Sequence, residues 1–552
     1  DDRGRVLQTQ SVNYTGGIDT SITQYSFDGK PLNNLLAQKK NGNNAQAHKI
    51  LTGMAYDAAG RLLAIYKNID NAAAAQLIAT NTYNELGQLS NKALGNSIEN
   101  LAYAYNIRGW LSSINKGYLS NGSGSSYFGM ELGYDKTTAA VSSTSYITPE
   151  YNGNIEGTIW RSKGDGVARK YDFTYDNANR ITAANYLQNT TGSAWDDSYL
   201  NFTTNNLGYD ANGNILTMNQ YGFKINGSTI IDQLTYTYQT NSNKLSQVND
   251  AANDPLSKLG DFHYTGTKQS YDYSYDGNGN LILDNNKAIS SIGYNYLNLP
   301  QGITVTAKGT ITYTYDAAGN KLAKTTVDNT ITPAKTTTTL YLGGTVYQND
   351  TLQFISHEEG RTRWANHKYL NGTTAYGFEY DYFLKDHLGN TRMVLTQEKD
   401  TAQYIATMEA AYRATENQLF YNIPQSSYAR SAISGYPSDP TTNPNDSVAR
   451  VNGNGPEVGP SILLRVMSGD VVDLAAKSFY KSGGTVPGPN STLTNVLNSL
   501  AGGLFTATSG AHGAITDLTN TSTSPVFAAL NSFLPTNDPN TTTTPKAYLN
   551  WI

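Results

Sequence analysis

The heptapeptide Tyr56-Asp57-Ala58-Ala59-Gly60-Arg61-Leu62 returns many times along this chain. Each copy has an aromatic residue before Asp or Asn, a Gly a few positions later, and Leu or Ile after the Gly. The best four copies hold Tyr56, Asp57 and Gly60; Tyr209, Asp210 and Gly213; Tyr275, Asp276 and Gly279; and Tyr315, Asp316 and Gly319. Weaker copies begin at Tyr83, Tyr105 and Tyr175, and looser ones at Tyr238 and Tyr296. An internal repeat of this kind sets the architecture before any single residue does.

Each copy is typical of a β-hairpin. Tyr ends one strand, Asp and Gly form the turn, and Leu or Ile starts the next strand, because Gly tolerates positive φ and Asp caps a turn locally. Aromatic residues alternate before the turn, as in Ile311-Thr312-Tyr313-Thr314-Tyr315, which is the period of a strand. A single hairpin cannot bury its apolar face, so consecutive hairpins are expected to pair into a long sheet.

The spacing between copies is uneven. Tyr56 and Tyr83 are 27 residues apart, whereas Tyr296 and Tyr315 are 19 apart. A strict solenoid keeps one period, so loops of different length are expected to decorate a common sheet. The chain opens on Asp1-Asp2-Arg3-Gly4-Arg5-Val6, which looks like a copy without its Tyr, and it stops at Tyr548-Leu549-Asn550-Trp551-Ile552. We therefore expect further sequence before the first residue and after the last.

The composition agrees with a sheet that has one face partly exposed to solvent. The chain has 41 Tyr, against 14 Phe and 5 Trp, and 15% charged residues. A Tyr ring packs while its hydroxyl reaches water or a backbone group. The net charge of −5 gives no general attraction to nucleic acid, and no apolar run of 18 residues predicts a membrane span. Cysteine is absent, so disulfides and thiolate metal sites are excluded.

One further stretch makes the pattern specific. Tyr382-Phe383-Leu384-Lys385-Asp386-His387-Leu388-Gly389-Asn390-Thr391-Arg392 follows the repeats. The repeats together with this stretch resemble the YD-repeat (Rhs) family over roughly residues 1–396, and Tyr127–Tyr134 is similar to its Bacteroidetes branch. The residues that match the core signature of the family, to which we assign a structural role, are Tyr382, Asp386, His387, Leu388, Gly389, Asn390 and Arg392.

The resemblance implies an all-β fold: antiparallel β-hairpins spiral and close into a hollow cocoon like that of Rhs and teneurin proteins, followed by a small loop-rich region. On this basis the chain divides into a YD-repeat shell (1–330), an Rhs core region (331–396) and a post-core region (397–552). In the post-core region we expect a helix over 403–414, strands over 461–467 and 471–476, and a helix over 492–505, from their apolar spacing.

The resemblance also implies a function. Such shells hold a variable C-terminal segment, often a polymorphic toxin used against neighbouring bacteria, so the expected partner is the chain's own C-terminal cargo, with secretion machinery or cell-surface proteins as further partners. The expected location is outside a bacterium or on its surface. A second hypothesis is a cell-surface adhesion protein with a teneurin-like shell. A third, an enzyme acting on surface sugars, requires a pair of catalytic carboxylates that the sequence does not single out.

The candidate chemical sites all have simpler interpretations. Asp276 to Asn280 resembles a calcium loop, but Leu281 stands where that loop requires Gly. His357-Glu358-Glu359 lacks the spacing of a metal motif. We expect His387 to be hydrogen-bonded where the sheet closes, and Asp386 to cap a turn before Gly389. We predict no catalytic, cofactor or metal-binding residue. The Asp-Pro steps at Asp254, Asp439 and Asp538 lack the context in which some Rhs relatives cleave themselves.

Overall fold

The computed structural model describes residues 1–190, 192, 194–224, 227–253, 261–264, 268–368, 374–398, 404–436, 446–452, 455–464, 466, 472–476 and 479. The chain forms two compact units, Asp1–Thr401 and Ala402–Ile552.

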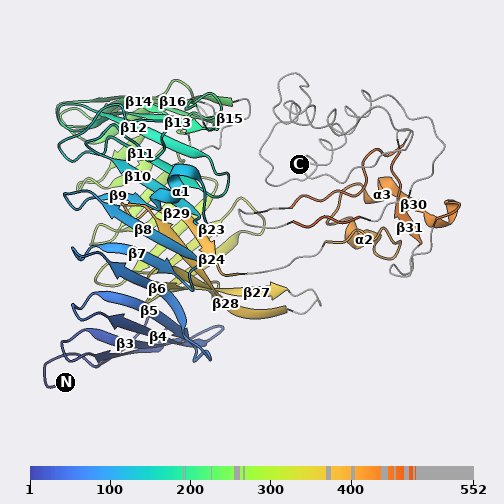
Figure 1. The fold of residues 1–552 in the computed structure, drawn as a ribbon, viewed down its shortest axis with the longest axis horizontal. Coiled ribbons are helices and arrows are strands. Elements are labelled where there is room, and N and C mark those ends of the chain that lie inside the picture. The colour runs from blue at the N-terminus through green and yellow to red at the C-terminus, as the bar shows by residue number, and fades with distance from the viewer. Residues whose placement is uncertain are drawn as a thin grey trace. The chain divides into compact units, whose positions relative to one another are not determined.

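The first unit holds two large sheets, coloured blue to green and green to orange in Figure 1. The strands of the first sheet are β1 Gln8–Val12, β2 Ile18–Tyr25, β3 Pro31–Lys40, β4 Gln46–Tyr56, β5 Leu62–Ile69, β6 Gln76–Tyr83, β7 Leu89–Leu94, β8 Glu99–Tyr105, β9 Leu111–Ile114, β10 Phe128–Gly133, β11 Gly157–Ser162, β12 Ala168–Tyr175, β13 Ile181–Asn189, β14 Thr204–Tyr209, β15 Ile215–Lys224, β16 Gly227–Tyr238 and β17 Leu245–Asp250. One short helix, α1 Lys116–Asn121, lies between β9 and β10.

The strands of the second sheet are β18 Tyr273–Tyr275, β19 Leu281–Asp284, β20 Ile289–Tyr294, β21 Pro300–Val305, β22 Gly309–Tyr315, β23 Lys321–Asp328, β24 Lys335–Leu342, β25 Thr345–Gln348, β26 Thr351–His357, β27 Gly360–Lys368, β28 Thr374–Lys385 and β29 Thr391–Thr396. In both sheets each strand pairs antiparallel with the next strand along the chain. The predicted all-β fold of antiparallel hairpin repeats is therefore confirmed.

The four best YD turns share one hydrogen-bond pattern. In the copy at Tyr56, the Asp57 N–H donates to the Arg61 carbonyl at 3.0 Å, and the Gly60 N–H donates to the Asp57 carbonyl at 2.9 Å. The Asp57 carboxylate also accepts the Arg61 N–H at 2.8 Å. Gly60 has φ +80°, where a residue with a side chain is strained. The turns at Asp210, Asp276 and Asp316 repeat these bonds.

The repeat tyrosines form a ladder of hydroxyl bonds. Each hydroxyl donates to the carbonyl of a residue that follows the preceding turn: Tyr56 to Pro31, Tyr83 to Leu62, Tyr105 to Leu89, Tyr175 to Ile155, Tyr209 to Ile181, Tyr238 to Ile215, Tyr275 to Leu245 and Tyr315 to Pro300, over 2.6–3.0 Å. Phe could fill the same volume but could not make this bond. The ladder explains why the repeat requires Tyr, and the prediction that its hydroxyl reaches a backbone group is correct.

The ladder corrects and extends the set of repeats. The copy assigned to Tyr296 begins at Tyr294, whose hydroxyl bonds the Leu281 carbonyl at 2.6 Å. Tyr134 is another rung, because its hydroxyl reaches the Leu111 carbonyl at 3.1 Å. The sequence pattern does not reveal a copy at Tyr25, because Ser26 stands in the place of Asp.

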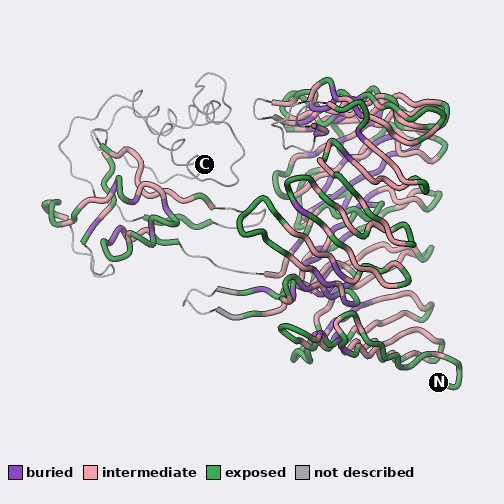
Figure 2. The backbone as a smooth tube through the Cα atoms, turned by 180° about the vertical axis from the view of Figure 1, so that it is seen from behind, coloured by how far each residue is buried: buried purple, intermediate pink, exposed green. Residues whose placement is uncertain are grey.

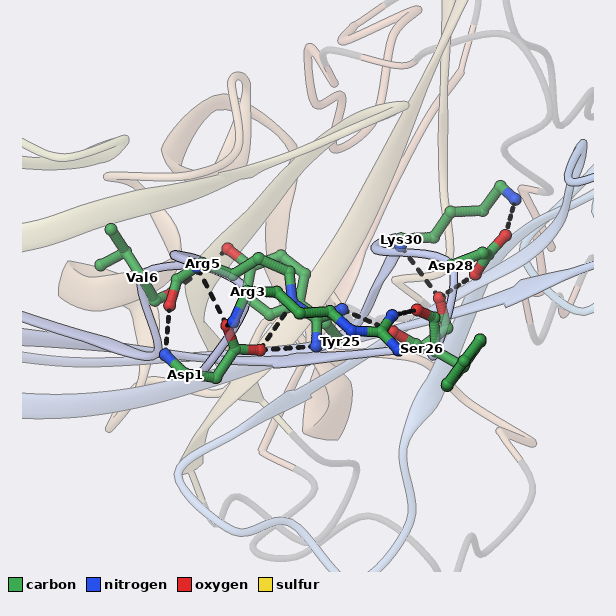
Figure 3. A network of polar contacts seen from close by, with 9 residues as sticks. Asp1, Arg3, Arg5, Val6, Tyr25, Ser26, Asp28 and Lys30 are labelled. Carbon is green, nitrogen blue, oxygen red and sulfur yellow. Dashed lines mark hydrogen bonds and ion pairs between the residues drawn. The ribbon is translucent and has the colours of Figure 1, made fainter.

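Figure 3 shows the opening turn beside the turn at Ser26. The N–H of Arg5 donates to the Asp1 carboxylate at 3.0 Å, and the Tyr25 hydroxyl reaches the Val6 carbonyl at 3.2 Å. The Ser26 hydroxyl accepts the Lys30 N–H at 2.9 Å, as the Asp carboxylate does elsewhere. Asp1 to Arg5 therefore forms a repeat turn, as its sequence predicts.

Two hydrophobic cores join the sheets. The larger core contains, from the first sheet, Ile65, Ile78, Ala79, Leu94, Leu101, Ile114, Phe128, Met130 and Leu132, with Tyr134, and from the second sheet Tyr382, Leu384 and Leu395. The smaller core packs Ile50 and Ile69 of the first sheet on Ala323, Leu340, Leu342, Tyr347, Leu352 and Ile355 of the second. Figure 2 shows exposed residues gathered at the turns and buried ones along the strands.

The sheet is continuous across residue 330, where we divide the repeat shell from the core region. β23 pairs with β24 from Ala323–Leu340 to Asp328–Lys335, so the core region continues the repeat sheet without a break. The compact unit ends at Thr401, five residues after the expected end of the core region.

The second unit is small and irregular in its described part. It holds α2 Arg413–Glu416, α3 Ile423–Ser426, the 3-10 helix η1 Arg430–Ala432, and a pair of short strands, β30 Ser427–Ala429 and β31 Ser447–Ala449. The prediction of a helix over 403–414 is wrong for the described residues 404–412, and α2 covers only its last two positions. The Glu416 carboxylate accepts the N–H groups of Thr407 and Met408, at 2.7 and 3.1 Å, and so turns that segment back on α2.

The prediction of strands over 461–467 and 471–476 is also wrong for the described residues of those ranges. These residues contribute a single bridge, between Tyr421 and Ser461. The helix predicted over 492–505 lies outside the described residues.

Candidate functional site

The core signature is a repeat turn in which Lys385 stands in the place of Tyr and Thr391 in the place of Leu or Ile. The Asp386 N–H donates to the Asn390 carbonyl and the Gly389 N–H to the Asp386 carbonyl, both at 3.0 Å. The Asp386 carboxylate accepts the Asn390 N–H at 2.9 Å, and Gly389 has φ +84°. Lys385 pairs with Thr391 across the bulge where Tyr stands in the repeats. This turn therefore has no tyrosine to join the ladder, and the predicted capping role of Asp386 is confirmed.

Arg392 forms an ion pair with the aspartate of the signature turn. Its guanidinium contacts the buried Asp386 carboxylate at 2.6 and 2.8 Å. Burial acts to raise the pKa of Asp386, but the hydrogen bonds from Asn390 and Arg392 prevail and lower it. Asp386 therefore stays ionised, which suits a structural ion pair better than proton transfer.

His387 and Leu388 form the tip of this turn and are exposed, Leu388 by 74%. The prediction that His387 is hydrogen-bonded is wrong for the described part of the chain, which offers its side chain no hydrogen-bond partner. The repeat turn places this position outward, because the Asp side chain already occupies the inside of the turn.

Tyr382 connects the signature hairpin to β6 of the first sheet. Its side chain is fully buried in the larger core. Its hydroxyl donates to the Leu77 carbonyl and accepts from the Gln76 amide, both at 3.3 Å. These partners lie more than 300 residues earlier, on β6. The signature strand β28 is thus docked on the first sheet by an aromatic anchor whose polar end is satisfied.

Three lysines of the first sheet extend this docking into a line of ion pairs, which we call the seam. Lys40 on β3 contacts Asp350 at 2.8 Å, Lys67 on β5 contacts Glu358 at 3.2 Å, and Lys92 on β7 contacts Glu359 at 2.7 Å. The carboxylates lie on the β25–β26 and β26–β27 turns. The seam could not be predicted from the sequence, because a lysine on every second strand forms no recognisable sequence motif.

Asp381 holds the other face of β28 in place. Its buried carboxylate contacts Arg361 at 3.0 Å and Arg363 at 2.7 Å, and Arg363 continues to Glu398 at 2.6 Å. Burial acts to raise the pKa of Asp381, whereas the bonds from Arg363 and Arg361 lower it overall. A buried carboxylate with two guanidinium partners is a structural clamp.

A second group of buried charges lies under β10–β12. Glu131, Glu156 and Asp172 are almost fully buried, as is Tyr146, whose hydroxyl contacts the Glu131 carboxylate at 3.3 Å. Lys170 contacts Asp172 at 2.7 Å. Burial raises the pKa of Glu156 to about 7.

Among the described residues, no group of three His, Asp or Glu side chains has a geometry that could hold a metal ion. No helix among the described residues is long and apolar enough to cross a membrane.

No family model and no curated protein sequence matches this chain. Solved structures resemble it. One is a Photorhabdus luminescens Tc holotoxin pore with a mutation in TccC3, at 14% identity over 70% of this chain and 18% of that one, with a TM-score of 0.45. Another is TcdB2-TccC3 without its hypervariable C-terminal region, at 14% identity over 69% and 17%, with a TM-score of 0.44. A third is TcdB2-TccC3-Cdc42, at 15% identity over 69% and 17%, with a TM-score of 0.44.

This chain therefore spans less than a fifth of the length of those proteins. Its fold is assigned from its own strand pairing.

Proposed function

We propose that this chain is the wall and closing region of an Rhs-type shell that carries a C-terminal toxin or effector outside a bacterium. The observation that carries the proposal is the return of the signature hairpin to β6 through Tyr382, across 305 residues of sequence. A strip of paired hairpins whose last strands dock on an early strand tends to enclose space. It also covers strand edges that would otherwise pair with other chains.

The construction of the wall supports this role. The hydroxyl ladder fastens each hairpin to its neighbour through backbone carbonyls, so the loops between repeats are free to vary in length without loss of the sheet. The buried charges of the seam and of Asp381 are engaged in ion pairs within the wall. This arrangement favours a container over a catalyst, and we propose that the described unit has no enzymatic step of its own.

The Rhs resemblance of the repeats and the signature supplies the remaining parts of the proposal: interbacterial antagonism, a Bacteroidetes-type source and the cargo as main partner. A tyrosine-rich wall suits an unfolded cargo, because Tyr rings contact polypeptide without sequence preference.

The test uses the natural protein with whatever sequence follows Ile552. The intact mass is measured in native buffer and after denaturation, and the native sample is treated with protease. A C-terminal fragment that stays bound, resists protease and separates on denaturation supports the carrier. The matched variant Tyr382→Ala, which removes the anchor, is expected to expose that fragment to protease, whereas Tyr296→Ala, at an exposed ring, is not. A single uncut chain that ends in a surface anchor would overturn the proposal and favour adhesion.

A further inference from the structure

His357 is a buried histidine at the centre of the seam. It ends β26 and is only 8% exposed. Its Nδ1 accepts the Glu359 N–H at 3.2 Å, which requires Nδ1 to be unprotonated and assigns the proton of the neutral ring to Nε2. Nε2 has no hydrogen-bond partner among the described residues. The closed seam therefore holds a neutral imidazole whose Nδ1 is engaged as a hydrogen-bond acceptor.

The first sheet presents cations to this ring. Lys67 of β5 contacts Glu358, the residue after His357, and its positive charge lowers the pKa of His357. Lys92 of β7 contacts Glu359, the residue whose N–H the ring accepts. Tyr103 of β8 lies close enough to Glu359 for that carboxylate to raise its pKa, after the larger effect of burial.

The second sheet presents aromatic rings and a paired carboxylate. The ring centroids of Tyr380 and Tyr382 on β28 lie 6.0 and 5.4 Å from that of His357. Asp381, between them, is paired with Arg361 of β27 at 3.0 Å. The two acidic groups that follow His357 are also engaged, Glu358 by Lys67 and Glu359 by Lys92.

We propose that the β26–β27 turn is an acid-sensitive latch, in which protonation of His357 releases strands β26–β29, with the signature hairpin, from the first sheet. Protonation at Nδ1 removes the acceptor of the Glu359 N–H. Glu359 then loses the bond that orients it toward Lys92. The new cation lies beside Lys67 in a buried site, where like charges repel most strongly.

The sign of the pH effect follows from the two states. Burial, aided by Lys67, lowers the pKa of His357 from 6.5 to about 4 in the closed seam, against the opposing influence of Glu358 and of the Asp381 and Arg361 backbone. An opened seam returns the ring to its ordinary pKa. Closure is therefore fully favoured above pH 6.5 and is progressively lost as the pH falls toward 4. Between pH 7.5 and pH 5 the closing equilibrium is expected to weaken by about 30-fold.

The latch rests on the proposed function only for its consequence, which is release of cargo in an acidified compartment. The latch itself is a property of this chain and is tested without cargo.

The test is hydrogen exchange of the whole chain at pH 7.5 and pH 5, with rates corrected for the intrinsic effect of pH. The amides of β26–β29 in the wild type are expected to lose about 30-fold in protection at pH 5, while those of β14–β16, far from the seam along the strand order, keep theirs. His357→Asn, whose Oδ1 can replace Nδ1 as the acceptor but does not titrate, is expected to keep its β26–β29 protection at pH 5. Equal loss in the wild type and the Asn variant would overturn the latch, as would no loss in the wild type.

A second variant keeps the test decisive if His357→Asn does not fold. Lys67→Met removes the neighbouring cation and leaves Glu358 beside the ring, so the opening is expected to move to lower pH, because His357 is then protonated inside the closed seam at less cost. An unchanged opening pH in Lys67→Met would refute the latch. Release of a bound C-terminal fragment is measured separately at pH 5. If β26–β29 open at pH 5 but no fragment is released, the result counts against the proposed function and not against the latch.

Discussion

Replacing Tyr209 by Phe tests the hydroxyl ladder directly. The substitution removes one oxygen, which donates to the Ile181 carbonyl at 2.6 Å, and it leaves the ring in place. A hydrogen bond of this kind contributes about 0.5–1.5 kcal/mol net. The lower half of that range applies, because the bond lies at an exposed edge where water can replace it. We expect Tyr209→Phe to lower the free energy of unfolding by about 0.5–1 kcal/mol.

The ladder also predicts additivity. Tyr56, Tyr209 and Tyr315 make the same bond at distant places in the wall. Their triple replacement by Phe is expected to cost roughly the sum of the single losses, about 1.5–3 kcal/mol, because residues without shared partners act independently. The matched control is Tyr296→Phe, since that ring is 80% exposed and lies outside the ladder.

The assay is urea unfolding followed by fluorescence and circular dichroism, with hydrogen exchange of the strands next to each replaced Tyr to separate local from global loss. If Tyr296→Phe destabilises the protein as much as Tyr209→Phe does, the bond from hydroxyl to carbonyl is not what stabilises the repeat. A triple variant as stable as the wild type would refute the ladder in the same way.

Three further substitutions test the turn, the anchor and the buried acid. Gly213→Ala is expected to cost about 1 kcal/mol in urea unfolding, because Gly213 has φ +88°, whereas Gly277→Ala, in open space without a positive φ, serves as a near-neutral control. Tyr382→Ala is expected to cost about 3–5 kcal/mol by the same measurement and to expose β28 to protease, while Tyr382→Phe keeps the core and loses about 1 kcal/mol with the two 3.3 Å hydroxyl bonds. Relative to Glu156→Gln, the wild-type melting temperature is expected to fall between pH 5 and pH 8, because the pKa of Glu156 is raised to about 7 in the fold, so its contribution is fully present below pH 4.5 and is lost as the pH rises through 7. The opposite contribution of His357 is common to both proteins and cancels in this comparison. An identical pH profile in the two proteins would contradict the assignment.

The local part of the fold could be predicted from sequence, because the repeat turn is determined within seven residues. Asp57, Asp210, Asp276 and Asp316 all cap their turns as expected. The pattern missed or misplaced some copies, each for a local reason. The Ser26 hydroxyl replaces the carboxylate, and at Tyr294 a second tyrosine two residues later obscured the register.

The long-range part could not be predicted. Nothing in the sequence around Tyr382 identifies Leu77 as its partner, or pairs Lys92 with Glu359, because such pairs depend on how two sheets meet and not on local period. The predicted helix over 403–414 failed for a similar reason. Its apolar spacing is helical, but the Glu416 carboxylate captures the Thr407 and Met408 N–H groups in an arrangement that a periodicity argument does not include.

The separation of local and long-range contacts has a consequence for the order in which the wall forms and opens. Rungs of the ladder join residues 13 to 30 positions apart, as at Tyr294 and Tyr275. The lysine–glutamate pairs of the seam join residues 267 and 291 positions apart. The entropic cost of closing a loop rises with its length, so the rungs are expected to form before the seam. Once the wall exists, the seam is its least local set of contacts, and it can open without breaking a single rung. An acid-sensitive histidine within the seam is therefore placed where a small change in free energy releases β26–β29 and leaves the rungs of the ladder intact.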